Sequence, residues 1–166
     1  MAELARRIVL LGCAGSGKTT LARRLGEALG APVICLDAIW RPEWSKEVDR
    51  FREILVEAHA ADAWISDGNF ALATFDIRLP RADLIVWLDR PRLFSAWRAI
   101  ARVFRPGEAH RPRDLGKVLR FIWGFDRINR PRIEAARLKH GAEVPVVRLR
   151  NDREIVAFMS DFASEA

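Results

Sequence analysis

The apolar residues of this chain fall into two kinds of segment that alternate along its length. Short apolar runs, which are typical of buried strands, cover residues 8–11, 33–36, 63–66, 84–88 and 144–149. Longer stretches carry apolar residues at helical spacing: a stripe from Leu21 to Leu29, then residues 47–61, 91–103, 114–124, 131–140 and 152–162. Strands that alternate with helices predict an α/β fold, a parallel sheet covered by helices on both faces.

The turn between the first strand and the first helix is rich in glycine. Residues 12–19 read GCAGSGKT and match the pattern G-x-x-x-x-G-K-[ST] at every fixed position. Glycines permit the left-handed turns that let backbone N–H groups surround a phosphate, and the helix N-terminus adds a positive dipole end. A turn that binds nothing would need neither the lysine nor the paired threonines. The predicted nucleotide-binding residues of this loop are Gly12, Cys13, Ala14, Gly15, Ser16, Gly17, Lys18, Thr19 and Thr20.

Three aspartates follow predicted strands, at the sheet edge where parallel α/β proteins bind their ligands. Asp67 is expected to place Mg²⁺ together with Thr19, while Lys18 contacts the β- and γ-phosphates of ATP. Asp37 is expected to orient or deprotonate a hydroxyl of the acceptor, with a turn or a helix cap as the alternative. Asp89 directly precedes a helix, and capping accounts for it. The predicted acceptor site consists of Asp37, Trp40, Gly68, Asn69 and Phe70.

The tryptophans separate into two groups. Trp40 lies in a polar stretch, where it can form a wall of the acceptor pocket or pack beneath a loop. Trp64, Trp87 and Trp97 lie on predicted strands or helices, and we expect them in the core.

The net charge of +6 is concentrated in one region of the chain. Twelve arginines and one lysine against four acidic residues give +9 between Arg90 and Arg137. Such a concentration suits a polyphosphate, a nucleic acid or a membrane surface, with a solvated arginine-rich surface as the alternative. Arg98 and Arg102 share one face of a helix, so they are expected to bind ATP and to stabilise the transferring phosphoryl group together.

A polar segment rich in proline and glycine follows this helix. Residues 105–113 are expected to form a mobile lid, because such a segment cannot easily be part of a core. Its Arg111 and Arg113 are expected to close over the nucleotide.

Length and composition favour a single domain over residues 1–166. Two cysteines are too few for a disulfide framework, and neither a signal segment nor an apolar run of membrane-spanning length is present in the sequence. We therefore expect a cytoplasmic protein that does not act at a membrane, with an oligomeric state that the sequence leaves open.

Motifs along nearly the whole chain resemble the small adenylate-kinase-like P-loop proteins that in bacteria are called DNA topology modulation proteins. They are GCAGSGKTTLA from Gly12, LDAIW from Leu36, DGNF from Asp67, ADLIVWLDRPR from Ala82, the Arg98-x-x-x-Arg102 pair, RPRDL from Arg111 and VVRLRNDREIVAFM from Val146. The resemblance implies a P-loop NTPase three-layer sandwich with five parallel strands in the order 2-3-1-4-5, a short helix after strand two and an arginine-rich lid. It also implies that Arg98 stacks on the nucleotide base and that Arg102 contacts phosphates. Adenylate kinases proper carry Pro-Arg after their Asp-Gly-Phe, whereas this chain has Asn69-Phe70-Ala71, so AMP is not implied as the acceptor.

The function we expect is ATP- and Mg²⁺-dependent phosphoryl transfer to a small molecule, either nucleoside- or nucleotide-like or another hydroxyl compound. Two alternatives stay open at this point. In the first, the basic 90–137 face binds DNA and ATP acts as a switch. In the second, the protein is a slow NTPase without an acceptor. The residues predicted to act in catalysis are Lys18, Asp37, Arg98, Arg102, Arg111 and Arg113.

Overall fold

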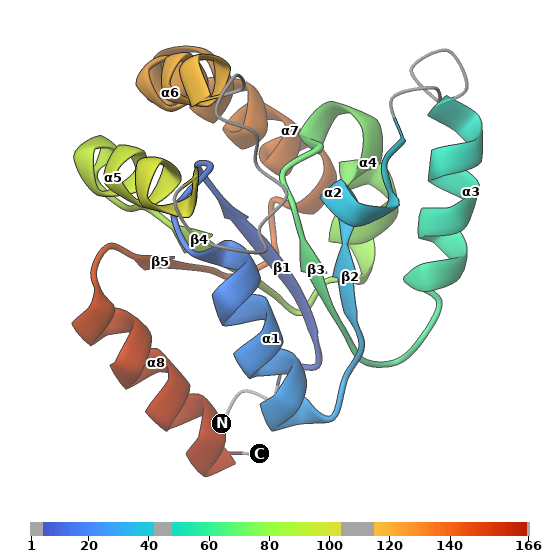
Figure 1. Cartoon of the computed structure of the whole chain (residues 1–166). Helices are drawn as coiled ribbons and strands as arrows, with labels where there is room; N and C mark the ends of the chain where they lie inside the picture. Colours follow the sequence, from blue (N-terminus) through green and yellow to red (C-terminus); the bar gives the residue numbers. More distant parts are fainter. Residues whose placement is uncertain (1–4, 42–47, 104–114, 166) are drawn as a thin grey trace.

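The computed structural model describes residues 5–41, 48–103 and 115–165. Its strands form one parallel sheet in the order β2-β3-β1-β4-β5, which confirms the predicted topology (Figure 1). The strands are β1 Arg7–Gly12, β2 Val33–Cys35, β3 Trp64–Asp67, β4 Leu84–Leu88 and β5 Val146–Leu149. The helices are α1 Lys18–Leu29, α2 Leu36–Ile39, α3 Val48–Ala58, α4 Ala71–Arg78, α5 Arg92–Val103, α6 Leu115–Gly124, α7 Arg130–Gly141 and α8 Asp152–Glu165. A 3₁₀ turn, η2, covers Leu79–Arg81, and a π-helical turn, η4, covers Phe125–Asn129.

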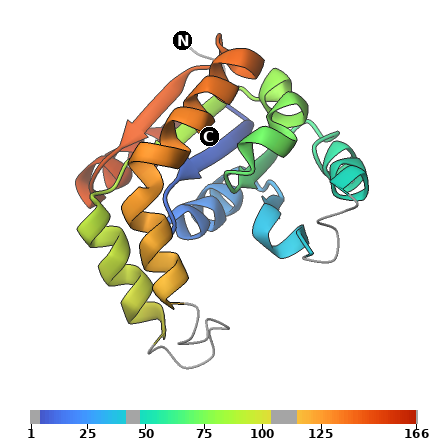
Figure 2. The same ribbon diagram turned by 90° about the horizontal axis from the view of Figure 1, so that it is seen from above.

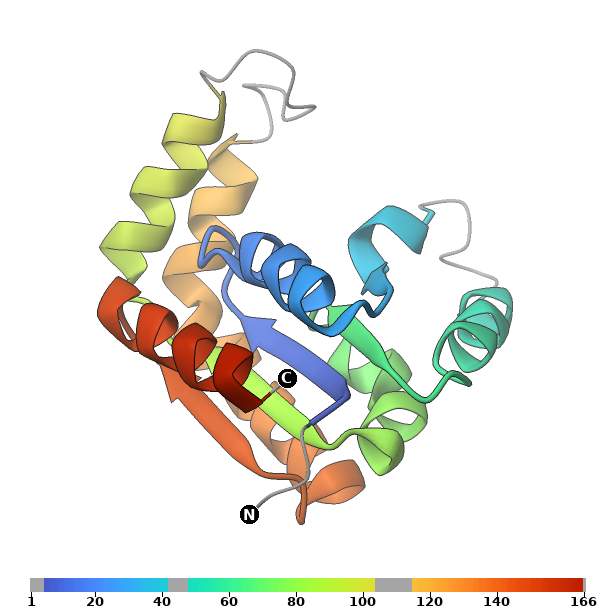
Figure 3. The ribbon, with the colours of Figure 1, turned by 90° about the horizontal axis from the view of Figure 1, so that it is seen from below.

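The side chains of β1 alternate between two apolar layers, as those of a strand buried on both faces must. Ile8 and Leu10 pack with Leu25 in the layer that α1 and α8 cover. Val9 and Leu11 belong to the opposite layer, to which α3, α4, α6 and α7 contribute. Figure 3 shows α1 and α8 together on one side of the sheet, and Figure 2 shows α5 and α6 side by side. One sheet between two helical layers is the predicted three-layer sandwich.

Two elements differ from those that the apolar pattern predicts. The sequence indicates no helix after β3, but α4 and η2 occupy residues 71–81 there. Helices α6 and α7 are joined by η4, whereas the pattern indicates two separate helices. Pro131, near the start of α7, has no N–H to donate to the preceding turn, and this favours an irregular hydrogen-bond pattern at the junction.

The prediction that Trp97 belongs to the core is wrong, because its side chain is 63 % exposed on α5. The buried face of α5 consists of Ser95 and Ala99, which lie four residues apart and therefore share a face. Trp97 comes midway between them and points to the opposite side. Trp64 and Trp87 are buried, as the sequence predicts.

Strand pairing brings the functional loops together at one edge of the sheet. Asp67, at the end of β3, is in register with Leu10 of β1 on one side and with Cys35 of β2 on the other. Gly12, at the end of β1, is in register with Leu88 of β4. The glycine-rich loop, the start of α2 and the turn after β3 therefore meet at the carboxyl ends of the strands, as the sequence predicts.

Candidate active site

The glycine-rich loop lies between β1 and α1 and packs tightly against its surroundings. A Cβ atom on Gly12, whose φ is +144°, would lie 2.6 Å from the carbonyl oxygen of Leu88. A Cβ atom on Gly15, whose φ is +77°, would lie 2.4 Å from the carbonyl oxygen of Ser95. Only glycine fits at these two positions, so the loop holds its backbone close to β4 and α5 in one conformation. This is the preorganised backbone that a phosphate-binding loop requires.

Lys18 begins α1 and folds its side chain back over the loop. Its Nζ donates hydrogen bonds of 2.9 Å to the carbonyl oxygens of Gly12 and Cys13. Burial lowers the pKa of Lys18, while the charges of Asp67 and Asp37 act in the opposite direction. The ammonium group therefore contacts the loop and is within electrostatic reach of two carboxylates, and from there it can contact a phosphate bound by the loop.

Thr19 and Asp67 form the pair that the sequence predicts for Mg²⁺. Thr19 Oγ1 donates a 2.6 Å hydrogen bond to Asp67 Oδ2. Asp67 is 2 % exposed, and its other oxygen, Oδ1, is buried without a hydrogen-bond partner among the residues that the structure describes. A buried carboxylate oxygen without a partner is costly unless a ligand or water satisfies it. A hydroxyl and a carboxylate beside a phosphate loop are the oxygen donors that Mg²⁺ uses in nucleotide sites, so these residues fit the ion.

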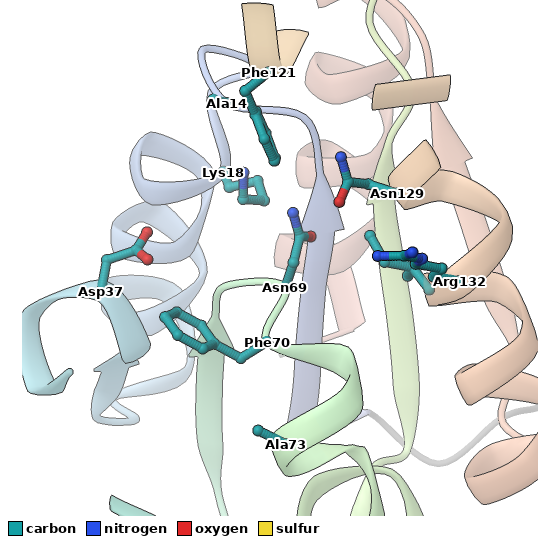
Figure 4. A pocket seen from close by; sticks show the side chains of 10 residues that line it. Ala14, Lys18, Asp37, Asn69, Phe70, Ala73, Phe121, Asn129 and Arg132 are labelled. Atoms are coloured by element: carbon teal, nitrogen blue, oxygen red, sulfur yellow. The ribbon is translucent and has the colours of Figure 1, made fainter. Parts of the chain in front are cut away.

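A cavity of about 520 Å³ opens beside Lys18, and Figure 4 shows the side chains around it. Asp37 and Lys18 lie toward one side of this cavity, and Asn129 and Arg132 lie across from Asp37. The residues that line it are Ala14, Lys18, Asp37, Asn69, Phe70, Ala73, Phe121, Asn129, Arg132 and Ile133. Mostly apolar walls with a few converging polar groups are typical of a small-molecule site.

Asp37 lies in the first turn of α2, while the cap position of that helix belongs to Cys35. Its carboxylate lines the cavity, so the capping alternative does not describe its place in the fold. Burial raises the pKa of Asp37; the nearby Lys18 ammonium lowers it, and the Asp67 carboxylate adds to the rise. A carboxylate with a raised pKa is a stronger base, which is what proton abstraction from a hydroxyl requires.

Of the other predicted acceptor residues, some line the cavity and some lie behind those that do. Asn69 and Phe70 line it directly. Trp40 is not among the lining residues; its ring lies 5.8 Å from that of Phe70 and 5.1 Å from that of Phe51, measured between centroids. Trp40 therefore packs behind Phe70. Gly68 contributes backbone to the turn between β3 and Asn69.

The predicted arginine pair lies near the phosphate loop. Arg98 Nη1 lies 3.7 Å from the position that a Cβ atom would take on Gly17. The charge of Arg102 lowers the pKa of Lys18, so this guanidinium is within electrostatic reach of the lysine. The predicted lid at 105–113, with Arg111 and Arg113, lies outside the described residues.

Sequence reasoning did not find the side of the cavity that Asn129 and Arg132 form. These residues come from η4 and α7, more than a hundred positions after the phosphate loop, and no motif marks them. The signal that could have pointed to them is the interrupted helix before Pro131, because π-helical turns are frequent at functional sites.

Ion pairs engage part of the basic region between Arg90 and Arg137. Arg90 pairs with Asp152, and Arg92 pairs with Asp126 at 2.7 Å. Arg130 pairs with Asp89 at 2.5 Å. Because α5 begins only at Arg92, the prediction that Asp89 caps this helix is wrong, and Asp89 instead forms an ion pair that joins the end of β4 to α7. These contacts reduce the positive charge that the region presents to a polyanion.

No family model matches this sequence, and no curated protein matches it. Solved structures do show similarity. Shikimate kinase from Acinetobacter baumannii in complex with shikimate is 21 % identical, with 94 % of this chain and 89 % of that chain covered and a TM-score of 0.59. A gluconokinase from Sinorhizobium meliloti 1021 is 20 % identical, with 98 % and 95 % covered and a TM-score of 0.60.

A sugar kinase from Janibacter sp. HTCC2649 is 17 % identical, with 97 % of this chain and 95 % of that chain covered and a TM-score of 0.59. At these identities the likeness shows the fold, which is that of small P-loop kinases. The expected closeness to DNA topology modulation proteins stays a prediction.

Proposed function

We propose that this protein is an ATP- and Mg²⁺-dependent kinase that transfers a phosphoryl group to a hydroxyl of a small molecule. The observation that carries this proposal is that Lys18 and Asp37 line one cavity of about 520 Å³. Thr19, the residue after Lys18, donates a hydrogen bond to Asp67, whose charge acts on Lys18. A cavity of this size suits a small molecule. The structural neighbours named above as shikimate, glucono- and sugar kinases support the same class of reaction.

The phosphate loop and its neighbours account for the ATP side of the reaction. Backbone N–H groups of the loop bind phosphates, and Lys18 exchanges its two carbonyl contacts for phosphate oxygens. Thr19 and Asp67 would hold Mg²⁺, which neutralises phosphate charge when it is bound. In this proposal Arg98 stacks on the base, and Arg102 stabilises the charge on the transferring group with Arg111 and Arg113.

The cavity accounts for the acceptor side. Asp37 accepts the hydroxyl proton or orients the hydroxyl toward the phosphate, and its raised pKa favours the first role. Phe70 and Phe121 provide apolar walls, while Asn129 and Arg132 can donate hydrogen bonds to polar substituents at the far side. The acceptor is therefore a compact polyhydroxyl or ring compound that carries oxygen acceptors away from the reacting hydroxyl.

The two alternative functions remain outcomes of the same experiment. In the part of the chain that the structure describes, no observation favours a DNA-binding switch over a kinase, and ion pairs engage several of the arginines concerned. The cytoplasmic location also stays a prediction. None of the described helices is both long and apolar enough to cross a membrane.

The test is the rate of ADP formation from ATP and Mg²⁺ with a panel of candidate acceptors. The panel contains shikimate, gluconate, hexoses, nucleosides and nucleoside monophosphates. We expect at least one compound to accelerate ADP formation well above the rate without acceptor. An equal slow rate with every compound would support the acceptor-less NTPase, and no ADP formation combined with tight duplex binding would support the DNA-binding switch.

A further inference from the structure

Arg78, the last residue of α4, is fully buried and donates its hydrogen bonds to β3 and to the turn that follows it. Its Nη1 donates to Ser66 Oγ at 3.1 Å and to the carbonyl oxygen of Gly68 at 3.0 Å. Its Nη2 donates to the carbonyl oxygen of Asn69 at 2.7 Å. No carboxylate of the described residues accepts a hydrogen bond from this guanidinium, although the charge of Asp67 acts on it. Burying a guanidinium that is not hydrogen-bonded to a carboxylate costs free energy. The role of Arg78 must therefore be sought in the backbone oxygens that accept its hydrogen bonds.

Ser66 is held from its other side by a neutral histidine. His59 Nδ1 lies 2.7 Å from the carbonyl oxygen of Leu55; because a carbonyl only accepts, this nitrogen carries the hydrogen. Burial lowers the pKa of His59 to about 4, so Nε2 is unprotonated at neutral pH and accepts the Ser66 hydroxyl hydrogen over 2.9 Å. The lone pairs of Ser66 Oγ then face Arg78.

The turn that Arg78 holds contains strained backbone. Phe70 has a φ of +29°, in a region that bulky L side chains rarely adopt. A residue keeps such a conformation only when its surroundings fix it. The ring of Phe70 packs against those of Trp40 and Phe51 and lines the cavity, so relaxation of this backbone would move a wall of the acceptor site.

The same turn is fastened to the phosphate loop by the amide of Asn69. Asn69 Nδ2 donates to the carbonyl oxygen of Gly12 at 2.9 Å, and the Gly12 N–H donates back to Asn69 Oδ1 at 3.2 Å. The carbonyl oxygen of Gly12 also accepts from Lys18 Nζ. A continuous series of hydrogen bonds therefore runs from buried Arg78 through Asn69 and Gly12 to Lys18.

We propose that Arg78 is a positioning residue for the transfer reaction, which fixes the acceptor turn and the phosphate loop relative to each other through Asn69. This inference rests on the proposed kinase function. Arg78 does not line the cavity, so its effect reaches the reacting groups only through the backbone that it holds. Small displacements of reacting groups have large effects on transfer rates, which makes such a residue kinetically visible.

The experiment compares Arg78→Met, Arg78→Lys and the matched control Arg81→Met. Arg81 lies three residues further on, is exposed and donates to the carbonyl oxygen of Ala60, outside the network. We expect Arg78→Met to lower kcat/KM for the acceptor about 10²-fold while KM for ATP changes little. Arg78→Lys should recover part of this loss, because an ammonium can satisfy some of the same oxygens. Arg81→Met should behave as wild type.

Amide hydrogen exchange at Gly12 provides a second readout that does not depend on activity. Arg78→Met should accelerate exchange at Gly12 and at residues 68–70, and leave exchange in β4 unchanged. Wild-type kinetics and wild-type Gly12 exchange in Arg78→Met would overturn the proposal. If wild-type protein transfers no phosphoryl group, the kinase function fails, and the Gly12 exchange alone decides whether Arg78 positions the two loops.

If Arg78→Met does not fold, Ser66→Ala replaces it as the test variant. It removes one of the three oxygens that accept from Arg78 and leaves both backbone contacts. We expect a smaller effect in the same direction on acceptor kcat/KM and on Gly12 exchange. No effect on either measurement would overturn the proposal.

Discussion

Thr19 Oγ1 donates a 2.6 Å hydrogen bond to Asp67 Oδ2, and this bond ties the first turn of α1 to the carboxyl end of β3. The two residues are 48 positions apart in the chain, and the sheet register brings them together because β1 and β3 are neighbours. The bond uses one carboxylate oxygen and leaves Oδ1 of Asp67 without a protein partner among the described residues. This geometry fits a shared role in holding Mg²⁺ beside a bound nucleotide.

Replacing Thr19 tests that role. Thr19→Val removes the hydroxyl at nearly constant volume, so the Mg²⁺ concentration for half-maximal activity should rise about 10- to 100-fold, as is typical when metal-site contacts are lost. Thr19→Ser keeps the hydroxyl and is the matched control. A Mg²⁺ titration of activity that is identical for Thr19→Val and wild type would contradict the assignment.

Replacing Asp37 tests its role as the base for the acceptor. Asp37→Asn should lower kcat by about 10²-fold or more, since a general base contributes at least that much, while ATP binding and Tm change little. Because burial raises the pKa of Asp37 and only the carboxylate accepts a proton, wild-type activity should fall as pH drops through that raised pKa. The pH profile of Asp37→Asn should lack this acidic fall. A parallel loss of Tm and activity would instead indicate a structural role.

His59 should make stability depend on pH. Burial lowers the pKa of His59 from 6.5 to about 4, so between these values the unfolded chain takes up a proton that the folded protein does not. Stability is therefore lost as pH falls through this window, by up to roughly 3 kcal/mol for a shift of this size. Urea unfolding at several pH values should show this loss in wild type. His59→Gln should lose less stability across the same pH window. An equal decrease in the free energy of unfolding with falling pH in both proteins would contradict this assignment of the pH dependence to His59.

Replacing Arg102 tests whether the basic region binds the nucleotide or DNA, and replacing Arg120 is the matched control. Arg120 is exposed on α6 within the same basic region. We expect Arg102→Gln to weaken ATP binding or turnover and Arg120→Gln to leave both unchanged. If the region binds DNA, each substitution should instead flatten the salt dependence of duplex binding by about one unit and spare ATP affinity.

Much of the fold could be predicted from the sequence because the loop motif and the pattern of apolar residues both indicate a parallel α/β sheet. The phosphate loop fixes the order strand, loop, helix, and short apolar runs mark strands that are buried on both faces. Helix α4 was not predicted because it is short and no capping side chain marks its start. The turn before it is held instead by hydrogen bonds from Arg78, the last residue of the same helix. Trp97 was misplaced because aromatic character alone does not show which side of a helix faces the core.

The candidate site was predictable where a motif or a strand end marks it, and not elsewhere. Lys18, Thr19, Asp37 and Asp67 lie where parallel strands end, so sequence and topology together place them. Arg132 and Asn129 reach the cavity through the packing of α7 against α4, which depends on side-chain fit over long separations. No local pattern encodes that packing.

The most direct test of the kinase assignment is transfer of radiolabel from the γ-phosphate of ATP to an acceptor that accelerates ADP formation. The labelled product should accumulate with the same rate as ADP in wild type. In Lys18→Ala the backbone of the loop is retained, but a contact worth several kcal/mol to the transition state is lost, so the product should be nearly absent although the protein folds. Label found only in inorganic phosphate, or undiminished product with Lys18→Ala, would contradict the account.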